Sequence, residues 1–188
     1  MSRDCRVREE NDKTMIDVVG ENLEYFSIKV ENLALGKNVS VSTIYPYPPY
    51  SDPSNAVDGR TGFADSGLLF HTDFELYPWL TIALGTLSIV KNVILHNRSD
   101  GHGRWLHNVE IRGGISSVWS EMNTCGTFVG PSQTGKIHTI ECGARPLLNV
   151  LYVTVKIVRP NYITDDWNAR DGKNALGLEE VVVNGLNV

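Results

Sequence analysis

The sequence lacks the features that mark several classes of protein. It has 17 lysines and arginines against 22 aspartates and glutamates, a formal net charge of −5, so it offers no basic surface of the kind that nucleic-acid binding needs. No apolar run approaches the roughly 18 to 20 residues that cross a bilayer. The start, MSRDCRVREENDK, is charged where a signal peptide would be apolar. We therefore expect no nucleic-acid partner, no transmembrane segment and no signal peptide in this chain.

Cysteine is also scarce. The three cysteines, Cys5, Cys125 and Cys142, allow at most one intrachain disulfide, and no Cys-x-x-Cys pair or Cys/His cluster indicates zinc. Cys125 and Cys142 flank a segment that is typical of two short strands joined by a turn, so a bridge between them is geometrically reasonable. Two reduced, buried thiols are the alternative that the residues leave open.

Charge is unevenly distributed along the chain. Residues 1–31 hold 5 basic and 8 acidic residues, a third of all the charged residues in a sixth of the length. We interpret residues 1–31 as a charged N-terminal linker or the tail of a preceding unit, with a possible short strand at Tyr25–Val30. Residues 32–188 are long enough for one domain with a core of its own.

A convincing long helical period is missing as well. From residue 33 onward, short runs rich in Val, Ile, Thr and aromatic residues alternate with Gly, Pro, Asn and Asp. This pattern predicts an all-β fold, an antiparallel β-sandwich that carries its function on long loops at one end. The predicted strands are Val39–Thr43, Trp79–Leu84, Val90–His96, Val109–Arg112, Lys136–Glu141, Val150–Val158 and Leu178–Val183.

The longest stretch without a predicted strand runs from Pro46 to Leu76. A loop of about 30 residues inside a compact domain should have its own anchor. Within it, the segment Ser54–Gly59, SNAVDG, supplies short oxygen-bearing side chains and a turn glycine, which suit a calcium ion. An Asx-turn at Asp58 explains the same residues equally well.

Four motifs follow one another along residues 32–188: NLALGK at 32–37, SNAVDG at 54–59, PWLTIALG at 78–85 and NVEIRGG at 108–114. In this order they resemble the motifs of the F-type lectin (fucolectin) domain. This family lies within the wider discoidin or coagulation-factor C-type group of galactose-binding jelly-roll sandwiches. The wider group shares the first and third motifs, so these define the fold better than the ligand.

The resemblance implies a sugar site. The family signature is a His, an Arg about 27 positions later within Arg-x-Asp, and then a basic residue; here His71 and Arg98 are 27 positions apart and Asp100 completes Arg-x-Asp. The N–H groups of His71 and Arg98 suit the hydroxyls of an uncharged deoxy sugar. Taken alone, Arg98 and Asp100 are more simply interpreted as a surface ion pair. The basic residue, Arg104, comes one position early and Trp105 stands in its place. Either could complete the pocket, and Trp105 could also be a core residue.

The resemblance also implies a structural calcium ion. In the family, the SNAxDG turn, a backbone group shortly before the His and a Cys-Glu pair in the last strand hold it. Here Glu179 replaces that cysteine, so the family's disulfide to the His-bearing loop is missing. The oxygens expected to bind calcium belong to Asn55, Asp58, Arg60, Leu68, Glu179 and Glu180, those of Asn55, Arg60 and Leu68 through their backbone carbonyls.

These implications define the expected function. We expect a non-catalytic, extracellular or secreted lectin that binds terminal L-fucose on glycans or glycoproteins, with multivalency from a homo-oligomer or a tandem array. A discoidin-like adhesion module that binds phospholipid or protein through its loop tips is the alternative, because 43–50 carries three tyrosines and three prolines. The resemblance supports the Cys125–Cys142 bridge. No motif of an enzyme is found.

Two further expectations follow from single residues. Sugar affinity should fall below about pH 6, where His71 would lose its acceptor nitrogen. Of the two glycosylation sequons, at Asn38 and Asn97, the second overlaps the expected site, so we expect Asn97 to stay unmodified.

Overall fold

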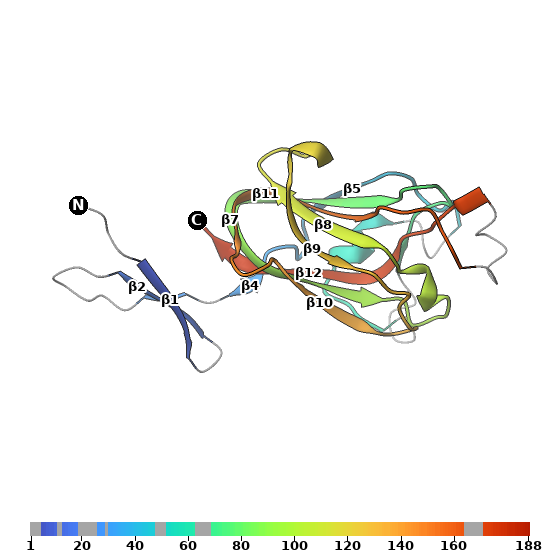
Figure 1. Cartoon of the computed structure of the whole chain (residues 1–188). Coiled ribbons are helices and arrows are strands. Elements are labelled where there is room, and N and C mark those ends of the chain that lie inside the picture. The colour runs from blue at the N-terminus through green and yellow to red at the C-terminus, as the bar shows by residue number, and fades with distance from the viewer. Residues whose placement is uncertain are drawn as a thin grey trace. The chain divides into compact units, whose positions relative to one another are not determined.

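The chain divides into two compact units, Met1–Glu31 and Asn32–Val188. The computed structural model describes residues 5–10, 13–18, 26–28, 30–47, 52–62, 69–163 and 171–188. In the first unit, β1 (Cys5–Glu10), β2 (Lys13–Val18) and β3 (Phe26–Ile28) form an antiparallel sheet in the order β1-β2-β3 (Figure 1). The sequence indicated β3 within Tyr25–Val30 but not the β1–β2 hairpin.

The second unit is built on one nine-stranded sheet with the order β4-β12-β7-β11-β8-β9, to which β5, β6 and β10 add at the sides. Helical segments are short 3-10 turns: η1 (Pro53–Val57), η2 (Gly103–Trp105) and η3 (Trp119–Glu121). The strands are β4 (Glu31–Asn32), β5 (Asn38–Val41), β6 (Phe70–His71), β7 (Trp79–Asn97), β8 (Val109–Gly114), β9 (Asn123–Phe128), β10 (Ile137–Glu141), β11 (Leu147–Ile157) and β12 (Gly177–Asn187).

Strand β7 makes this sheet a sandwich. Its first half pairs with β5 and β11, whereas its second half pairs with β12 and β10. The strand crosses from one layer to the other at the exposed residues 85–87, where Gly85 has a positive φ of 86° that favours glycine (Figure 1). The sequence predicted two strands here, Trp79–Leu84 and Val90–His96, because the polar crossing resembles a turn.

Alternation of side chains explains why the two layers pack. Along the first half of β7, the buried Leu80, Ile82 and Leu84 point into the core, and Val93 and Leu95 do the same from the second half. Burying such aliphatic side chains contributes roughly 1.5 to 3 kcal/mol each, so the two inner faces account for the association of the layers. The predicted antiparallel β-sandwich is confirmed. No helix among the described residues is long and apolar enough to span a membrane.

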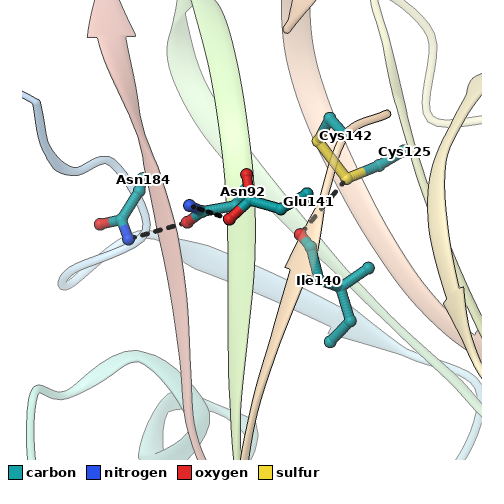
Figure 2. The surroundings of a disulfide bond; sticks show 6 residues. All are labelled: Asn92, Cys125, Ile140, Glu141, Cys142 and Asn184. Carbon is teal, nitrogen blue, oxygen red and sulfur yellow. Dashed lines mark hydrogen bonds between the residues drawn. A yellow bond between two sulfur atoms is a disulfide. The ribbon is translucent and has the colours of Figure 1, made fainter. Parts of the chain in front are cut away.

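A disulfide joins the edges of the two layers. Cys125 lies in β9, at the end of one layer, and bonds to Cys142, which directly follows β10 of the other layer (Figure 2). Beside it, Asn184 donates to Asn92 and Asn92 donates to Glu141, a line of polar contacts across β12, β7 and β10. The expected Cys125–Cys142 bridge is therefore present, and the thiol alternative is not.

Candidate functional site

A cavity of about 330 Å³ lies at the end of the sandwich away from the β7 crossing. The residues of its walls come from the segments that precede β7 and directly follow β7, which meet at this end. Of the five residues expected to bind sugar, the structure brings together His71, Arg98, Asp100 and Trp105. The other lining residues are Tyr45, Phe74 and His102.

Strand pairing places His71 next to Arg98. In the register of β12, Gly177 pairs with His71 and Leu178 pairs with Asn97, the residue before Arg98. A Cβ atom at Gly177 would lie 3.2 Å from Cδ2 of His71 and 3.4 Å from Nη1 of Arg98. The missing side chain at Gly177 therefore lets the two polar groups approach each other across the start of β12.

Arg98 is fixed by a two-point ion pair. Its Nε donates to Oδ1 of Asp100 and its Nη2 to Oδ2, each at 2.8 Å, and Arg98 is only 5% exposed. Burial alone would raise the pKa of Asp100, but the hydrogen bonds and charge of Arg98 outweigh burial and hold that pKa below its usual value. The remaining nitrogen, Nη1, is buried and has no hydrogen-bond partner among the described residues. An unpaired guanidinium nitrogen of this kind is costly unless a ligand or water satisfies it.

His71 supplies an acceptor beside that donor. The side chain is 3% exposed, and its Nδ1 contacts the carbonyl oxygen of Thr72, which requires a proton on Nδ1. Neutral imidazole then has an acceptor at Nε2. Burial, and after it the positive charge of Arg98, lowers the pKa of His71 to about 4. At neutral pH the cavity therefore presents one neutral acceptor and one charged donor.

The η2 turn decides between Arg104 and Trp105. The turn follows His102, whose φ of 53° is left-handed, and a Cβ at Gly103 would lie 2.2 Å from the backbone nitrogen of Thr134, so only glycine fits there. This geometry directs Trp105 inward and leaves Arg104 exposed and outside the lining. The expectation that Arg104 reaches the pocket is not met, because adjacent residues of a tight turn point in different directions.

Trp105 lines the cavity and packs against its neighbours more than it exposes a ring face for stacking. Its ring stacks on His102 at 4.4 Å between centroids, and Cζ of Arg98 lies 5.0 Å from its centroid. The edges of the ring approach His71 at 5.5 Å and Phe74 at 5.2 Å. These contacts fix the two polar groups in place.

Two aromatic residues complete the wall. Tyr45 donates its backbone N–H to the carbonyl of His71 at 3.0 Å and packs on the imidazole at 4.8 Å between centroids. Tyr45 belongs to the tyrosine-rich segment 43–50, which the sequence indicated as a candidate for loop-tip contact with phospholipid or protein. Phe74 and His102 were missed, because no motif singles them out and only the folded loops bring them to the cavity.

The loop that begins in η1 is tied to β12 by acidic side chains. Glu179 accepts hydrogen bonds from the backbone of Gly62 at 2.7 Å and of Ser99 at 2.9 Å, and from the Ser99 hydroxyl. Glu180 accepts from the backbone of Gly59 at 3.1 Å. Glu179 therefore anchors this loop to β12 through hydrogen bonds.

Glu180 fits a cation better than the other residues expected to bind calcium. Asp58 lies near it, although one oxygen of Asp58 already accepts from the backbone N–H of Arg60 at 2.8 Å, which is the Asx-turn that the sequence also allowed. Glu180 is 1% exposed, and its Oε1 has no hydrogen-bond partner in the described part of the chain. Burial, together with the nearby charge of Asp58, raises the pKa of Glu180 to about 7, although the Gly59 N–H opposes this. A cation beside these carboxyl groups would satisfy the orphaned oxygen.

The remaining residues of the expected set fit less well. The Glu179 oxygens already accept the hydrogen bonds described above. The side-chain amide of Asn55 donates to the carbonyl of Leu69 at 3.4 Å, which leaves the expected ligand, the backbone carbonyl of Asn55, untested. Arg60 is exposed, and Leu68 lies outside the described residues. Across the described ranges, no group of three or more His, Cys, Asp or Glu side chains is placed to hold a metal. Calcium here would depend on Glu180, Asp58 and backbone oxygens.

Comparison with known proteins identifies the family. A family model described as a NedA-like, galactose-binding domain of the coagulation factor 5/8 type C group matches residues 55–150, which is 96 of the 188 residues. The chain belongs to this family. No curated protein sequence gives a significant match.

Solved structures narrow the resemblance. A fucolectin from striped bass (Morone saxatilis) serum is 26% identical, with a TM-score of 0.69 over 85% of this chain and 50% of the bass chain. A Streptococcus pneumoniae fucose-binding module is 22% identical, with a TM-score of 0.60 over 84% and 97% of the two chains. A family 32 carbohydrate-binding module of Clostridium perfringens NanJ, solved with galactose, is 13% identical, with a TM-score of 0.61 over 83% and 99%.

These likenesses confirm the F-type lectin resemblance within the discoidin-like group. The two bacterial modules are under 25% identical and support the fold alone. The chain spans half the length of the bass fucolectin, so it corresponds to about one half of that protein.

Proposed function

We propose that this chain is a non-catalytic lectin that binds terminal L-fucose in the cavity at the loop end of the sandwich. The observation that carries the proposal is the buried, unpaired Nη1 of Arg98. It lies near the His71 imidazole, so one hydroxyl of a ligand could satisfy Nη1 while an adjacent hydroxyl contacts His71.

The charge and shape of the cavity favour a deoxy sugar. The charges of Arg98 and Asp100 cancel and His71 is neutral, which suits an uncharged ligand. One wall is polar, whereas Tyr45, Phe74 and Trp105 make the other wall aromatic. L-Fucose has hydroxyls for the first wall and a C6 methyl group for the second. The likeness to a bass fucolectin supports this assignment.

The cavity offers little for catalysis. Hydrolysis of a glycosidic bond usually needs two carboxyl groups, one on each side of the bond. Asp100 is the one carboxyl residue in the described lining, and Arg98 holds both of its oxygens. A lectin should return its oligosaccharide unchanged, which chromatography of the glycan after long incubation would test.

Two sugars and two substitutions test the site. D-Arabinose is L-fucose without the C6 methyl, and removing one buried methyl should weaken binding by about 0.8 kcal/mol, roughly fourfold.

Arg98→Lys and His71→Gln should each lose about 0.5 to 3 kcal/mol of hydrogen bonding, enough to abolish retention on fucose-agarose. Their controls are Arg145→Lys, which changes an exposed arginine, and His96→Gln, outside the cavity. If both site variants are retained like the controls, the assignment is wrong.

We also propose a structural calcium ion at Glu180 and Asp58. The support is the orphaned Oε1 of Glu180 and the crowding of two carboxyl groups. Bound there, calcium would neutralise these groups and tie the loop after η1 to β12, outside the described lining of the cavity.

Weak single-site affinity makes multivalency part of the proposal. Fucose has about eleven heavy atoms, and at roughly −0.3 to −0.5 kcal/mol per atom one site yields millimolar to high micromolar affinity. A homo-oligomer or a longer chain with repeated domains would raise the avidity for fucosylated glycoproteins. The half-length match to the bass fucolectin favours the longer chain. The disulfide favours an extracellular location.

The alternative, an adhesion module for phospholipid or protein, rests on exposed apolar residues of the same loops. Ile44 and Tyr47 are exposed, whereas Tyr45 between them packs on His71. The packing of Tyr45 favours a pocket wall over a membrane spike. Sedimentation with phosphatidylserine liposomes distinguishes the two functions. If the chain is an adhesion module, Tyr47→Ser should reduce lipid binding and leave fucose binding unchanged.

A further inference from the structure

A second cavity, of about 220 Å³, lies on the outer face of the sandwich and shares no residue with the first. It is lined by Trp79, Thr81, Ser117, Trp119, Thr154 and Lys156. Strand register brings four of these together, because Thr81 pairs with Thr154 and Trp79 pairs with Lys156 across β7 and β11. They alternate with the core residues of both strands, so their side chains point outward.

One wall of this cavity is held in place before any ligand binds. Cζ of Arg112 lies 4.4 Å from the ring centroid of Trp119, and Nη1 of Arg112 donates to the Trp119 carbonyl at 3.3 Å. Arg112 is itself paired with Glu110, its Nε 2.5 Å from Oε1. These contacts fix η3, the yellow coil in Figure 1, on the β8 strand, so the wall needs little ordering on binding.

The polar groups of the cavity favour a negative charge. Nζ of Lys156 lies 5.2 Å from the Trp119 centroid, and in the described ranges no carboxylate forms an ion pair with it, since the nearby Glu110 is engaged by Arg112. Lys156 is the one charged residue in the described lining of this cavity, so the lining carries one positive charge. The loop-end cavity, in contrast, has no net charge.

Two buried hydroxyls add a donor. The Oγ1 atoms of Thr81 and Thr154 are 2.6 Å apart, and both residues are less than 5% exposed. Two hydroxyls have two protons, and their mutual hydrogen bond uses one. The second proton can therefore be donated to an oxygen of a ligand in the cavity.

We infer that this cavity is a second ligand site, which takes a carboxylate-bearing pyranose such as a uronic acid or a sialic acid. Two indole walls suit the C–H faces of a sugar ring, Lys156 pairs with its carboxylate, and the threonine hydroxyl donates to a ring substituent. The volume is below the roughly 300 to 1,000 Å³ of drug-sized pockets, which limits the occupant to about one ring.

Tryptophan indole N–H signals in a ¹⁵N-correlation spectrum can report on both sites at once. The chain has four tryptophans, which single Trp→Phe variants assign. We expect D-glucuronate to shift the signals of Trp79 and Trp119 in a saturable way, with N-acetylneuraminate as a separate arm that tells the two acids apart. D-Glucose, the uncharged counterpart, and acetate, the anion without a ring, should bind at least about tenfold more weakly.

Substitutions separate this inference from the fucose proposal. Lys156→Gln should weaken glucuronate binding about tenfold, whereas Lys136→Gln, an exposed control, should not. His71→Gln should lose fucose and keep glucuronate. The inference is overturned if neither acid shifts Trp79 or Trp119, if glucose or acetate binds equally well, or if Lys156→Gln binds like the parent. None of these outcomes bears on fucose binding at Trp105.

Discussion

His71 owes its role to burial. A histidine has an ordinary pKa of about 6.5, so the sequence alone indicated a loss of sugar affinity below about pH 6. In the folded chain the imidazole is 3% exposed and lies next to Arg98, and its pKa falls to about 4. That expectation therefore needs correction: the acceptor nitrogen should persist through mildly acidic conditions.

The pH dependence of fucose binding checks this correction. We expect the affinity to be constant from pH 8 to pH 5 and to fall only as the pH approaches 4. Because the pKa of His71 is depressed in the folded state, its contribution to stability is complete above pH 6.5 and is lost as the pH falls toward 4. Isothermal titration with fucose at each pH measures the affinity. A fall in affinity centred near pH 6.5 would contradict the low pKa of His71.

Asn97 shows how burial decides between two sequons. Its Nδ2 donates to the carbonyls of Gly103 and Gln133, each at 2.8 Å, and to the hydroxyl of Ser132 at 3.0 Å. Asn38 is exposed on β5. In an animal-cell secretion system we therefore expect a glycan on Asn38 and none on Asn97. Glycopeptide mass spectrometry measures this, and an occupied Asn97 in protein that still binds fucose would contradict the structure of the site.

At the scale of elements, the sequence predicted most strands because their side chains alternate. It indicated β9 only as one of the two short strands flanked by the cysteines, missed β4, β6 and the β1–β2 hairpin as strands, and divided β7, because short or polar strands carry little periodic signal. The motif spacing predicted His71, Arg98 and Asp100, since family loops hold them at fixed positions. It could not choose between Arg104 and Trp105, because that depends on the left-handed His102 and the close approach of Gly103 to Thr134.

The disulfide is a covalent tie between elements, and both of its cysteines are buried in the core. It links β9 to the end of β10, at the open edges of the two layers, and closes a loop with a sequence separation of 17. Chain-entropy estimates give about 3 kcal/mol for a loop of this size. Cys125→Ser should lower the free energy of unfolding by about that amount in urea, and Cys5→Ser, the matched control, should leave it unchanged. A Cys125→Ser chain as stable as the parent would mean that core packing alone holds these edges.

For the whole molecule, calcium should act on stability. The ion would relieve the repulsion between Glu180 and Asp58, so calcium should raise the melting temperature and EDTA should lower it. Glu180→Gln should remove the response to calcium, whereas Glu121→Gln, on the exposed surface of η3, should retain it. Scanning calorimetry measures the melting temperatures of the parent and of both variants. If parent protein melts at the same temperature in calcium and in EDTA, the hydrogen bonds of Glu179 and Glu180 hold the loop without a metal.

The two cavities also give the whole molecule two different surfaces. The uncharged cavity at the loop end and the positively charged one on the sheet face are built from different elements, with Trp105 in one and Trp79 and Trp119 in the other. A glycan that carries both fucose and an acidic sugar, and that spans the distance between the two cavities, would contact one chain twice and bind with higher effective affinity than fucose alone.

A titration of ¹⁵N-labelled protein with L-fucose is the decisive test of fucose binding in the loop-end cavity. We expect the indole N–H signal of Trp105 to shift with a dissociation constant in the millimolar to high micromolar range. The same signal should stay still in Arg98→Lys, while the signals of Trp79 and Trp119 stay still in both proteins. A Trp105 signal that does not respond to saturating L-fucose in the parent, or responds equally in Arg98→Lys, would contradict the account.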